Sequence, residues 1–210
     1  MKTAITLLIF LLTITLNAQP PSLTPSEKVL ADEIEFDHQV LVMLRNQTKA
    51  EFLKIISDDT HESPAIAIRL SNSDAQAIVT ELKNRLLFKG YILFISVIGN
   101  EGTNELYEIR LLKAQDPLIP IKYMKTESES PALTNDAIFN KIRRWNSRKG
   151  CTVNGAGKNW LHLKFVLPLK ETEELAQDMI EFCPNILKFN GSKENLVIDL
   201  KNKPSLYLEW

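Results

Sequence analysis

Two spacings of apolar residues divide the chain into predicted helices and strands. Apolar positions three and four residues apart predict helices, and such segments span residues 27–36, 48–56, 73–90, 134–150, 171–182 and 192–200. Short apolar or alternating runs between turn residues predict strands, over residues 39–45, 65–70, 91–98, 106–112, 119–124, 151–153, 160–167, 186–189 and 206–210. This mixture of elements predicts an α+β fold.

The order of these elements predicts a mixed or antiparallel sheet with helices on one face. A short Gly-Asn-Glu-Gly turn separates residues 91–98 from 106–112, which predicts an antiparallel hairpin. From residue 119 the order is β-α-β-β-α-β followed by α-β, the order of a ferredoxin-like unit with an extra helix and strand. The predicted regions are a flexible lead at 19–26, an N-terminal α+β region at 27–115 and a C-terminal region at 116–210. The pattern leaves open whether the last two regions form one compact unit.

The first residues predict export. Met1 and Lys2 provide a positive start, residues 4–16 form an almost unbroken apolar run, and Ala18 is a small residue where a signal peptidase would cut. This is the pattern of a secretory signal peptide over residues 1–18. The run is too short to span a bilayer as an anchor, and no cysteine follows it to carry a lipid. We expect an exported bacterial protein, periplasmic or secreted, without a stable membrane anchor.

Composition and charge argue against nucleic-acid binding. The 210 residues are 44% hydrophobic and 24% charged with a net charge of −1, which is ordinary for a globular protein. Nucleic-acid binding relies on clustered Lys and Arg. One basic cluster lies on a predicted helix, where its members face solvent; it consists of Lys141, Arg143, Arg144, Arg148 and Lys149. We expect no nucleic-acid partner.

Two cysteines, Cys151 and Cys183, remain after the predicted cleavage. In an oxidising compartment they could form a disulfide that closes a loop of roughly thirty residues and stabilises the fold by about 3 kcal/mol. Alternatively, each is a small buried apolar side chain. Their spacing lacks the pattern of a zinc site. A further alternative pairs Cys183 or Cys151 with His162 in a hydrolase-like enzyme, as nucleophile and base.

Residues 154–159 contain Gly-Ala-Gly-Lys, which is part of the phosphate-binding loop pattern. That pattern also requires a glycine where Thr152 stands, a hydroxyl where Asn159 stands, and a helix after the lysine. The following residues alternate like a strand, so a hairpin turn is favoured. An acidic turn at residues 57–62 has metal-ligand residue types but lacks the glycine and glutamate of a calcium loop. We therefore expect neither a cofactor nor a metal.

Alternation within residues 160–167 separates two faces of a predicted strand. Leu161, Leu163 and Phe165 share the apolar face, whereas Trp160 and His162 share the polar face. A tryptophan on a polar face favours a contact surface. The candidate binding residues lie around the glycine turn; they are Arg144, Trp145, Asn154, Lys158, Asn159, Trp160 and His162. Since no catalytic motif is assembled in the sequence, we expect a non-enzymatic binding or protein-interaction module, with another exported protein as its partner and the small-molecule ligand, if any, open.

Several short motifs in residues 116–210 occur together at a characteristic spacing. They are Met124 and Thr126; Ile138, Ile142 and Trp145; Gly155-Ala156-Gly157 with Asn159-Trp160; Phe182-Cys183-Pro184-Asn185; and Leu206-Tyr207-Leu208-Glu209-Trp210. With these motifs the segment resembles the DUF4253 family, a bacterial domain of unknown function. It departs from the family at Asn185, where aspartate is more common, and at Glu209-Trp210, where a double tryptophan is common. The resemblance implies a fold but no activity, and it makes a disulfide at Cys183 less favoured.

Overall fold

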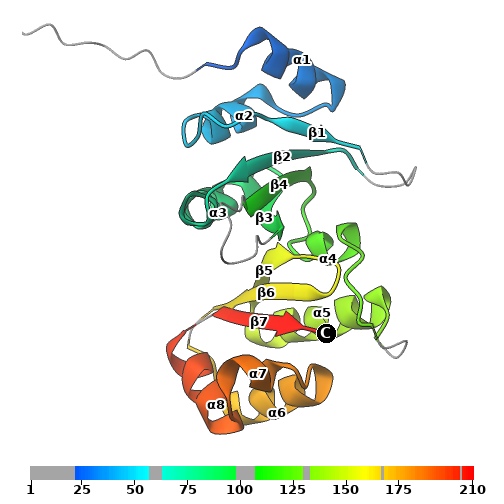
Figure 1. Cartoon of the computed structure of the whole chain (residues 1–210), viewed down its shortest axis with the longest axis vertical. Coiled ribbons are helices and arrows are strands. Elements are labelled where there is room, and N and C mark those ends of the chain that lie inside the picture. The colour runs from blue at the N-terminus through cyan, green and yellow to red at the C-terminus, as the bar shows by residue number, and fades with distance from the viewer. Residues whose placement is uncertain (1–21, 57–62, 98–106, 130–132, 167, 204) are drawn as a thin grey trace, which may run out of the picture.

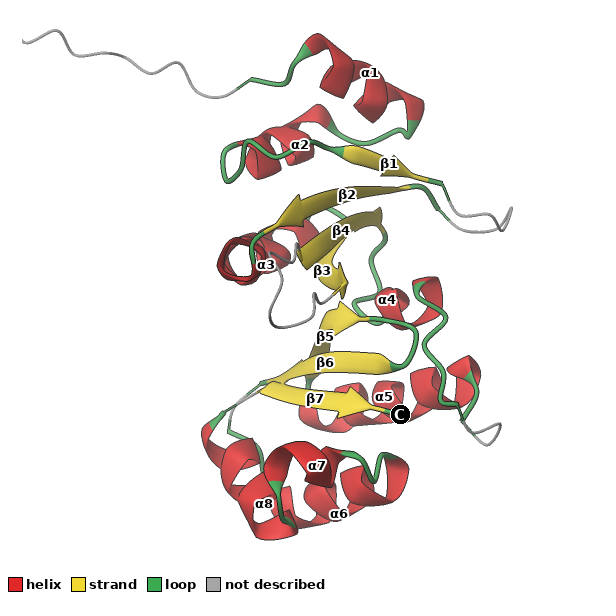
Figure 2. Ribbon diagram, viewed as in Figure 1, coloured by secondary structure: helices red, strands yellow, loops and turns green. Residues whose placement is uncertain are grey.

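The computed structural model of the chain describes residues 22–56, 63–97, 107–129, 133–166, 168–203 and 205–210. In these residues one seven-stranded sheet is flanked by eight helices (Figure 1, Figure 2). The strands are β1 (Leu53–Ile55), β2 (Ala65–Leu70), β3 (Tyr91–Val97), β4 (Tyr107–Lys113), β5 (Cys151–Ala156), β6 (Trp160–Phe165) and β7 (Ser205–Glu209). The helices are α1 (Pro25–Glu33), α2 (His38–Arg45), α3 (Asn72–Leu87), α4 (Ile119–Tyr123), α5 (Asn135–Lys149), α6 (Thr172–Phe182), α7 (Ile186–Asn190) and α8 (Lys193–Asn202).

The sheet joins the two halves of the chain through one parallel pair of strands. The strand order is β1-β2-β4-β3-β5-β6-β7. Strands β3 and β5 run parallel, with Ile95 opposite Gly155, and all other neighbours are antiparallel. The predicted hairpin is confirmed as β3–β4. In Figure 1 the sheet follows the long axis of the molecule, from β1 near α1 and α2 to β7 near α6, α7 and α8.

Helices cover both faces of the sheet and bury two apolar cores. Helices α1, α2 and α3 pack on one face of the N-terminal strands, where Leu93 and Leu111 are buried. Helices α4 to α8 pack on the other face, where Ile142, Leu161 and Leu208 are buried. The prediction of an α+β fold is confirmed, and the mixed sheet is confirmed with it. The prediction that helices cover one face only is wrong, because the N-terminal and C-terminal helices lie on opposite faces.

Strong periodic patterns predicted their elements well. The strand predicted at residues 65–70 is β2. The helices predicted at residues 134–150 and 192–200 are α5 and α8, and the hydroxyls of Thr134 and Ser192 accept backbone N–H groups at their starts. Helix α3 is capped by Ser71, whose hydroxyl accepts the N–H of Asp74. The range predicted for this helix, residues 73–90, starts two residues after this cap.

Four short segments have the opposite secondary structure to that predicted. The predicted strands at residues 39–45, 119–124 and 186–189 are the helices α2, α4 and α7, and the predicted helix at residues 48–56 contains the strand β1. In α2, the side chain of Asp37 caps the helix, and the buried residues Val40, Leu41 and Leu44 follow helical spacing. Helix α4 has proline in its first turn, where proline favours a helix. Runs this short fit either period, so tertiary contacts decide their conformation.

These differences remove the predicted ferredoxin-like order. From residue 119 the elements are α4, α5, β5, β6, α6, α7, α8 and β7. Two of the strands required for that order are the helices α4 and α7. The C-terminal strands instead continue a sheet that begins in the N-terminal half, since β5 lies beside β3.

Two predicted segments lie outside the described residues: the signal peptide at residues 1–18 and the acidic turn at residues 57–62. Within the described part of the chain, no helix has both the length and the apolar composition needed to cross a membrane.

Candidate functional site

The glycine turn between β5 and β6 is a packing site for Trp160. A Cβ atom at Gly157 would lie 2.0 Å from the indole Nε1 of Trp160, and one at Gly155 would lie 2.8 Å from its Cζ3. Only residues without a side chain leave room for the ring at this distance. The same indole stacks on Tyr207, with ring centroids 5.8 Å apart. The Gly-Ala-Gly motif therefore positions an aromatic ring.

Hydrogen bonds hold this turn between two other segments of the C-terminal part. The hydroxyl of the buried Thr126 donates to the carbonyl of Gly157 at 2.7 Å. The carbonyl of Lys158 accepts a backbone N–H at 2.7 Å, and the carbonyl of Asn159 accepts the backbone N–H of Trp210 at 3.0 Å. Lys158 and Asn159, both predicted as binding residues, thus fix the fold through their carbonyl groups.

A cavity of about 660 Å³ lies between α5, α6 and the end of β7, and we name it the C-terminal pocket. Two segments that are distant in sequence meet at its wall. The thiol of Cys183 donates to the carbonyl of Glu209 at 3.1 Å, and the indole N–H of Trp210 donates to the carbonyl of Phe182 at 3.3 Å. The rings of Phe182 and Trp210 pack edge to face with centroids 5.5 Å apart. The apolar part of the wall consists of Leu133, Ala137, Phe182, Cys183, Pro184 and Trp210.

Charged groups of both signs line the C-terminal pocket. Lys141 forms an ion pair with Asp178, which also accepts the indole N–H of Trp145 at 2.7 Å. Burial alone would raise the pKa of Asp178, but the hydrogen bonds from Lys141 and Trp145 outweigh burial and hold this pKa below its ordinary value. The remaining charged side chains of the lining include Glu129, Arg144 and Glu181.

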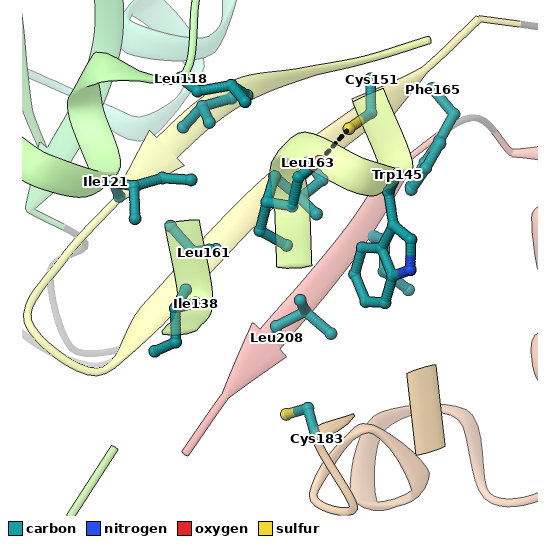
Figure 3. Packing of buried hydrophobic residues seen from close by; sticks show 14 of the residues in the cluster. Leu118, Ile121, Ile138, Trp145, Cys151, Leu161, Leu163, Phe165, Cys183 and Leu208 are labelled. Atoms are coloured by element: carbon teal, nitrogen blue, oxygen red, sulfur yellow. Dashed lines mark hydrogen bonds between the residues drawn. The ribbon is translucent and has the colours of Figure 1, made fainter. Parts of the chain in front are cut away.

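Both cysteines are free and buried, and both belong to the core on the pocket side of the sheet (Figure 3). Burial raises the pKa of Cys151 to about 12 and also raises the pKa of Cys183, so both thiols stay protonated at neutral pH. His162 alternates with the core residues Leu161 and Leu163 along β6, so its side chain points to the opposite side of the sheet. The structure therefore brings neither cysteine together with this histidine, and it does not join the cysteines to each other.

The side of β5, β6 and β7 opposite the pocket carries polar and aromatic side chains, and we name it the open face. Three of its residues, Thr152, Lys164 and Ser205, lie directly opposite one another on the three neighbouring strands. Their side chains are half-buried or exposed. Described residues on this side of the three strands include Thr152, Asn154, Trp160, His162, Lys164, Ser205 and Tyr207, with Glu209 at the end of β7 and Lys83 of α3 beside them.

Hydrogen bonds tie the open face to the N-terminal half of the chain. The amine of Lys83, on α3, donates to the hydroxyl of Thr152 at 2.6 Å and to the side-chain carbonyl of Asn154. On the next two strands, the Nε2 atom of His162 is hydrogen-bonded to the hydroxyl of Ser205. The open face therefore contains two small polar networks, with Lys164 beside both.

Basic groups on the open face are close enough for the charge of one to lower the pKa of another. Burial, followed by the nearby charge of Lys164, lowers the pKa of Lys83 from 10.5 to about 8. Burial also lowers the pKa of His162, and the charges of Lys83 and Lys164 add to this effect. Among the described residues, none of these three side chains forms an ion pair. In the residues that the structure describes, the open face is thus a basic surface whose centre has no acidic partner.

The structure divides the predicted binding residues between the two sides of the sheet. Arg144 lines the C-terminal pocket, and Trp145 is only 3% exposed beside it, in the core. Asn154, Trp160 and His162 lie on the open face, opposite that core. The predicted set therefore does not form one continuous surface.

Sequence reasoning missed most of what surrounds these residues. Lys83 is a residue of α3 far from the glycine turn in sequence, and no local pattern marks it. Ser205 and Tyr207 become neighbours of β6 only when β7 pairs with it. The wall of the C-terminal pocket had a signal, because Phe182, Cys183 and Trp210 belong to motifs that carry the family resemblance.

Comparison with known families supports that resemblance. The family model described as Domain of unknown function (DUF4253) matches residues 108–210, and this part of the chain belongs to that family. The match begins inside β4 and covers the C-terminal pocket. Searches of curated proteins and of solved structures gave no match. The described residues contain no group of three or more His, Cys, Asp or Glu side chains that could hold a metal ion.

Proposed function

We propose that this protein is a non-catalytic binding module whose C-terminal pocket holds a small organic molecule with an apolar ring or chain. One observation carries the proposal. Two family motifs, Phe182–Asn185 and the end of β7, are separate in sequence and meet at the wall of a cavity of about 660 Å³. A cavity of this size with a mainly apolar wall and a few polar groups is the usual form of a small-molecule site.

The shape and chemistry of the C-terminal pocket support a ligand of this class. Its volume lies within the range of roughly 300–1,000 Å³ that small-molecule sites occupy. An apolar wall would exclude water from a ring or chain, and Phe182 and Trp210 offer aromatic edges and faces to it. The polar end of the ligand could pair with a positive charge from Arg144 or with a negative charge from Glu129 or Glu181.

Binding is favoured over a covalent mechanism because the thiol in the pocket lacks activation. Burial raises the pKa of Cys183, and its thiol proton is donated to a backbone carbonyl. A nucleophilic cysteine needs a lowered pKa or an adjacent base. The base considered from the sequence, His162, lies on the opposite side of the sheet.

Export is part of this proposal and rests on the apolar run at residues 4–16. An exported binding module would meet its ligand, or another exported protein, outside the cytoplasm. Cell fractionation with intact-mass measurement tests this part. A mature protein that starts at Gln19 in the exported fraction supports it, and a full-length cytoplasmic protein contradicts it.

The pocket itself can be tested with three probes that share a ring and differ in charge: indole, tryptamine and indole-3-acetate. We expect at least one of them to bind the wild-type protein in calorimetric titration and to raise its melting temperature. The variant Ala137→Trp fills the pocket from α5 and should lose this binding. The control Asn140→Trp, at an exposed position of the same helix, should retain it. No binding by any probe, or equal binding by Ala137→Trp, would refute the proposal.

A further inference from the structure

We propose that the open face is a second binding site, specific for a phosphate group, carried either by inorganic phosphate or by a phosphate monoester. The site would be formed by the cross-strand row Thr152–Lys164–Ser205 together with Lys83 and His162. It lies on the opposite side of the sheet from the C-terminal pocket, so it does not depend on the function proposed for that pocket.

The register of the strands makes this site compact. Thr152 pairs with Lys164, and Lys164 pairs with Ser205. Neighbouring strands are about 4.8 Å apart, so the row of three side chains spans about 10 Å. Side chains directly opposite on one face of a sheet are within contact distance of each other. A phosphate group above Lys164 would therefore be within reach of a hydroxyl on either side.

Lys83 has hydrogen-bonding capacity left for a ligand. Its ammonium group has three N–H donors, and the structure shows two of them used, by Thr152 and Asn154. Because the hydroxyl of Thr152 accepts from Lys83, its own hydrogen is free to donate elsewhere. The third N–H of Lys83 and the O–H of Thr152 are thus two donors that an oxyanion can satisfy.

His162 and Ser205 can supply further donors in a way that depends on protonation. When His162 is neutral with Nε2 unprotonated, the hydroxyl of Ser205 donates to it. When the ring is protonated, Nε2–H donates to Ser205, which frees the hydroxyl hydrogen for a ligand. Protonation therefore adds a positive charge and a donor at the same time. A bound phosphate and a protonated His162 should stabilise each other.

The charge around the site favours an anion of more than one charge. Lys83, His162 and Lys164 have no ion-pair partner among the described residues. Two titratable side chains close to them are those of Tyr207, which is opposite His162 on β7, and of the buried Cys151, and both are neutral at pH 7. Glu209, the carboxylate of β7, affects the pKa of Tyr207 and lies two positions beyond it, away from Ser205. A phosphate dianion would neutralise a cluster that has no acidic partner in the described part of the chain.

The second site and the pocket are formed by different parts of the chain. Lys83 lies outside residues 108–210, the part that matches the family. Its amine reaches the C-terminal strands because β3, which follows α3, pairs with β5. The site therefore requires both halves of the chain, whereas the pocket is built within the family domain.

The test is an NMR titration of the full chain that follows the ring signals of His162 against pH. Without ligand, its pKa should lie below 6.5. Saturating inorganic phosphate or methyl phosphate should raise it by roughly one unit, the effect of an opposite charge at close range. The lower dissociation constant of the two identifies the free ion or the monoester as the preferred source. Acetate at the same concentration should leave the pKa unchanged.

Two variants with the same net charge separate a built site from general electrostatics. Lys83→Met with Lys164→Met should weaken phosphate binding at least about tenfold, the loss expected from one or two charge-assisted hydrogen bonds. The control Lys28→Met with Lys201→Met removes two exposed lysines on α1 and α8 and should leave binding unchanged. Equal loss in both variants, an equal effect of acetate, or no pKa change with either phosphate would overturn the proposal. Native-like spectra of each variant confirm that folding is retained.

Discussion

The two sides of strands β5, β6 and β7 use the same backbone for different purposes. On the pocket side, Leu161 and Leu163 are fully buried, and motifs of the family domain interlock through hydrogen bonds. On the open face, His162 and Lys164 of β6 are half-buried or exposed, and Thr152 and Asn154 of β5 accept hydrogen bonds from Lys83 of the other half of the chain. Strand alternation alone separates these two environments.

The two sides also differ in what their residues do. The glycines of the turn serve packing, whereas the lysines and the histidine of the open face contribute charge. The glycines of the turn are required by the indole of Trp160, whose nearest atoms leave no space for a Cβ. On the open face, Lys83 is held by hydrogen bonds to Thr152 and Asn154 at a place where burial lowers the pKa of its amine to about 8. A charged group that is costly to bury and has no acidic partner among the described residues supports the proposal of a binding role.

The largest difference between the two sides should appear when their tryptophans are removed. Trp145 is 3% exposed and donates a hydrogen bond to Asp178, so Trp145→Ala should lower the free energy of unfolding by about 3–5 kcal/mol. Trp160 is half-buried on the open face, and Trp160→Ala should cost less than half of that. Urea denaturation measures both values. Equal losses would mean that the open face is as tightly packed as the core.

A smaller loss is expected from Gly157→Ala, because the added Cβ overlaps the indole of Trp160. Overpacking of this kind costs about 1–3 kcal/mol. The same substitution in a Trp160→Ala background should cost much less, since the clash is gone, and the coupling energy from this double-mutant cycle isolates the contact. Additive effects would show that the glycine is needed for another reason.

Stability should depend on pH through Lys83. Its pKa is about 8 in the folded chain and 10.5 as an ordinary value, so between these values the unfolded chain binds more protons. The free energy of unfolding contributed by this group therefore rises with pH across that window. The cost of burying the charge is complete below about pH 8 and absent above about pH 10.5. The difference in stability between wild type and Lys83→Met should change over this window alone; a difference that stays constant from pH 7 to 11 contradicts the assignment.

The smallest effect is expected at the thiols. Both cysteines are buried with raised pKa values, so iodoacetamide at pH 8 should leave them unmodified in the folded protein and modify both after denaturation. Intact mass after timed incubation measures this. Fast alkylation of Cys183 in the native state would revive the alternative of a cysteine-dependent enzyme in the pocket.

The sequence predicted long periodic elements and failed at short apolar runs. Helices α3, α5, α6 and α8 each had several apolar residues at helical spacing, and β2 and the β3–β4 hairpin had clear boundaries. The run at residues 39–45 is apolar at nearly every position, so its period cannot be read, and burial of Val40, Leu41 and Leu44 makes it a helix. The same ambiguity affected α4 and α7, which are five residues long.

The sequence predicted the candidate site only where the side-chain direction follows from alternation within one strand. Alternation correctly placed Trp160 and His162 opposite Leu161 and Leu163. The register of β7 against β6, and the reach of Lys83 from α3, depend on long-range pairing that no local pattern encodes. For the same reason the predicted binding residues were grouped by proximity in sequence, although the sheet separates Arg144 from Trp160.

One NMR experiment tests directly whether the two sides of the sheet are separate binding surfaces. The ring signals of His162 report on the open face, and the indole N–H signal of Trp210 reports on the C-terminal pocket. Adding inorganic phosphate should move the His162 signals and leave Trp210 unchanged, and adding indole should do the reverse. Phosphate that moves Trp210, indole that moves His162, or signals that respond to neither ligand would contradict the account.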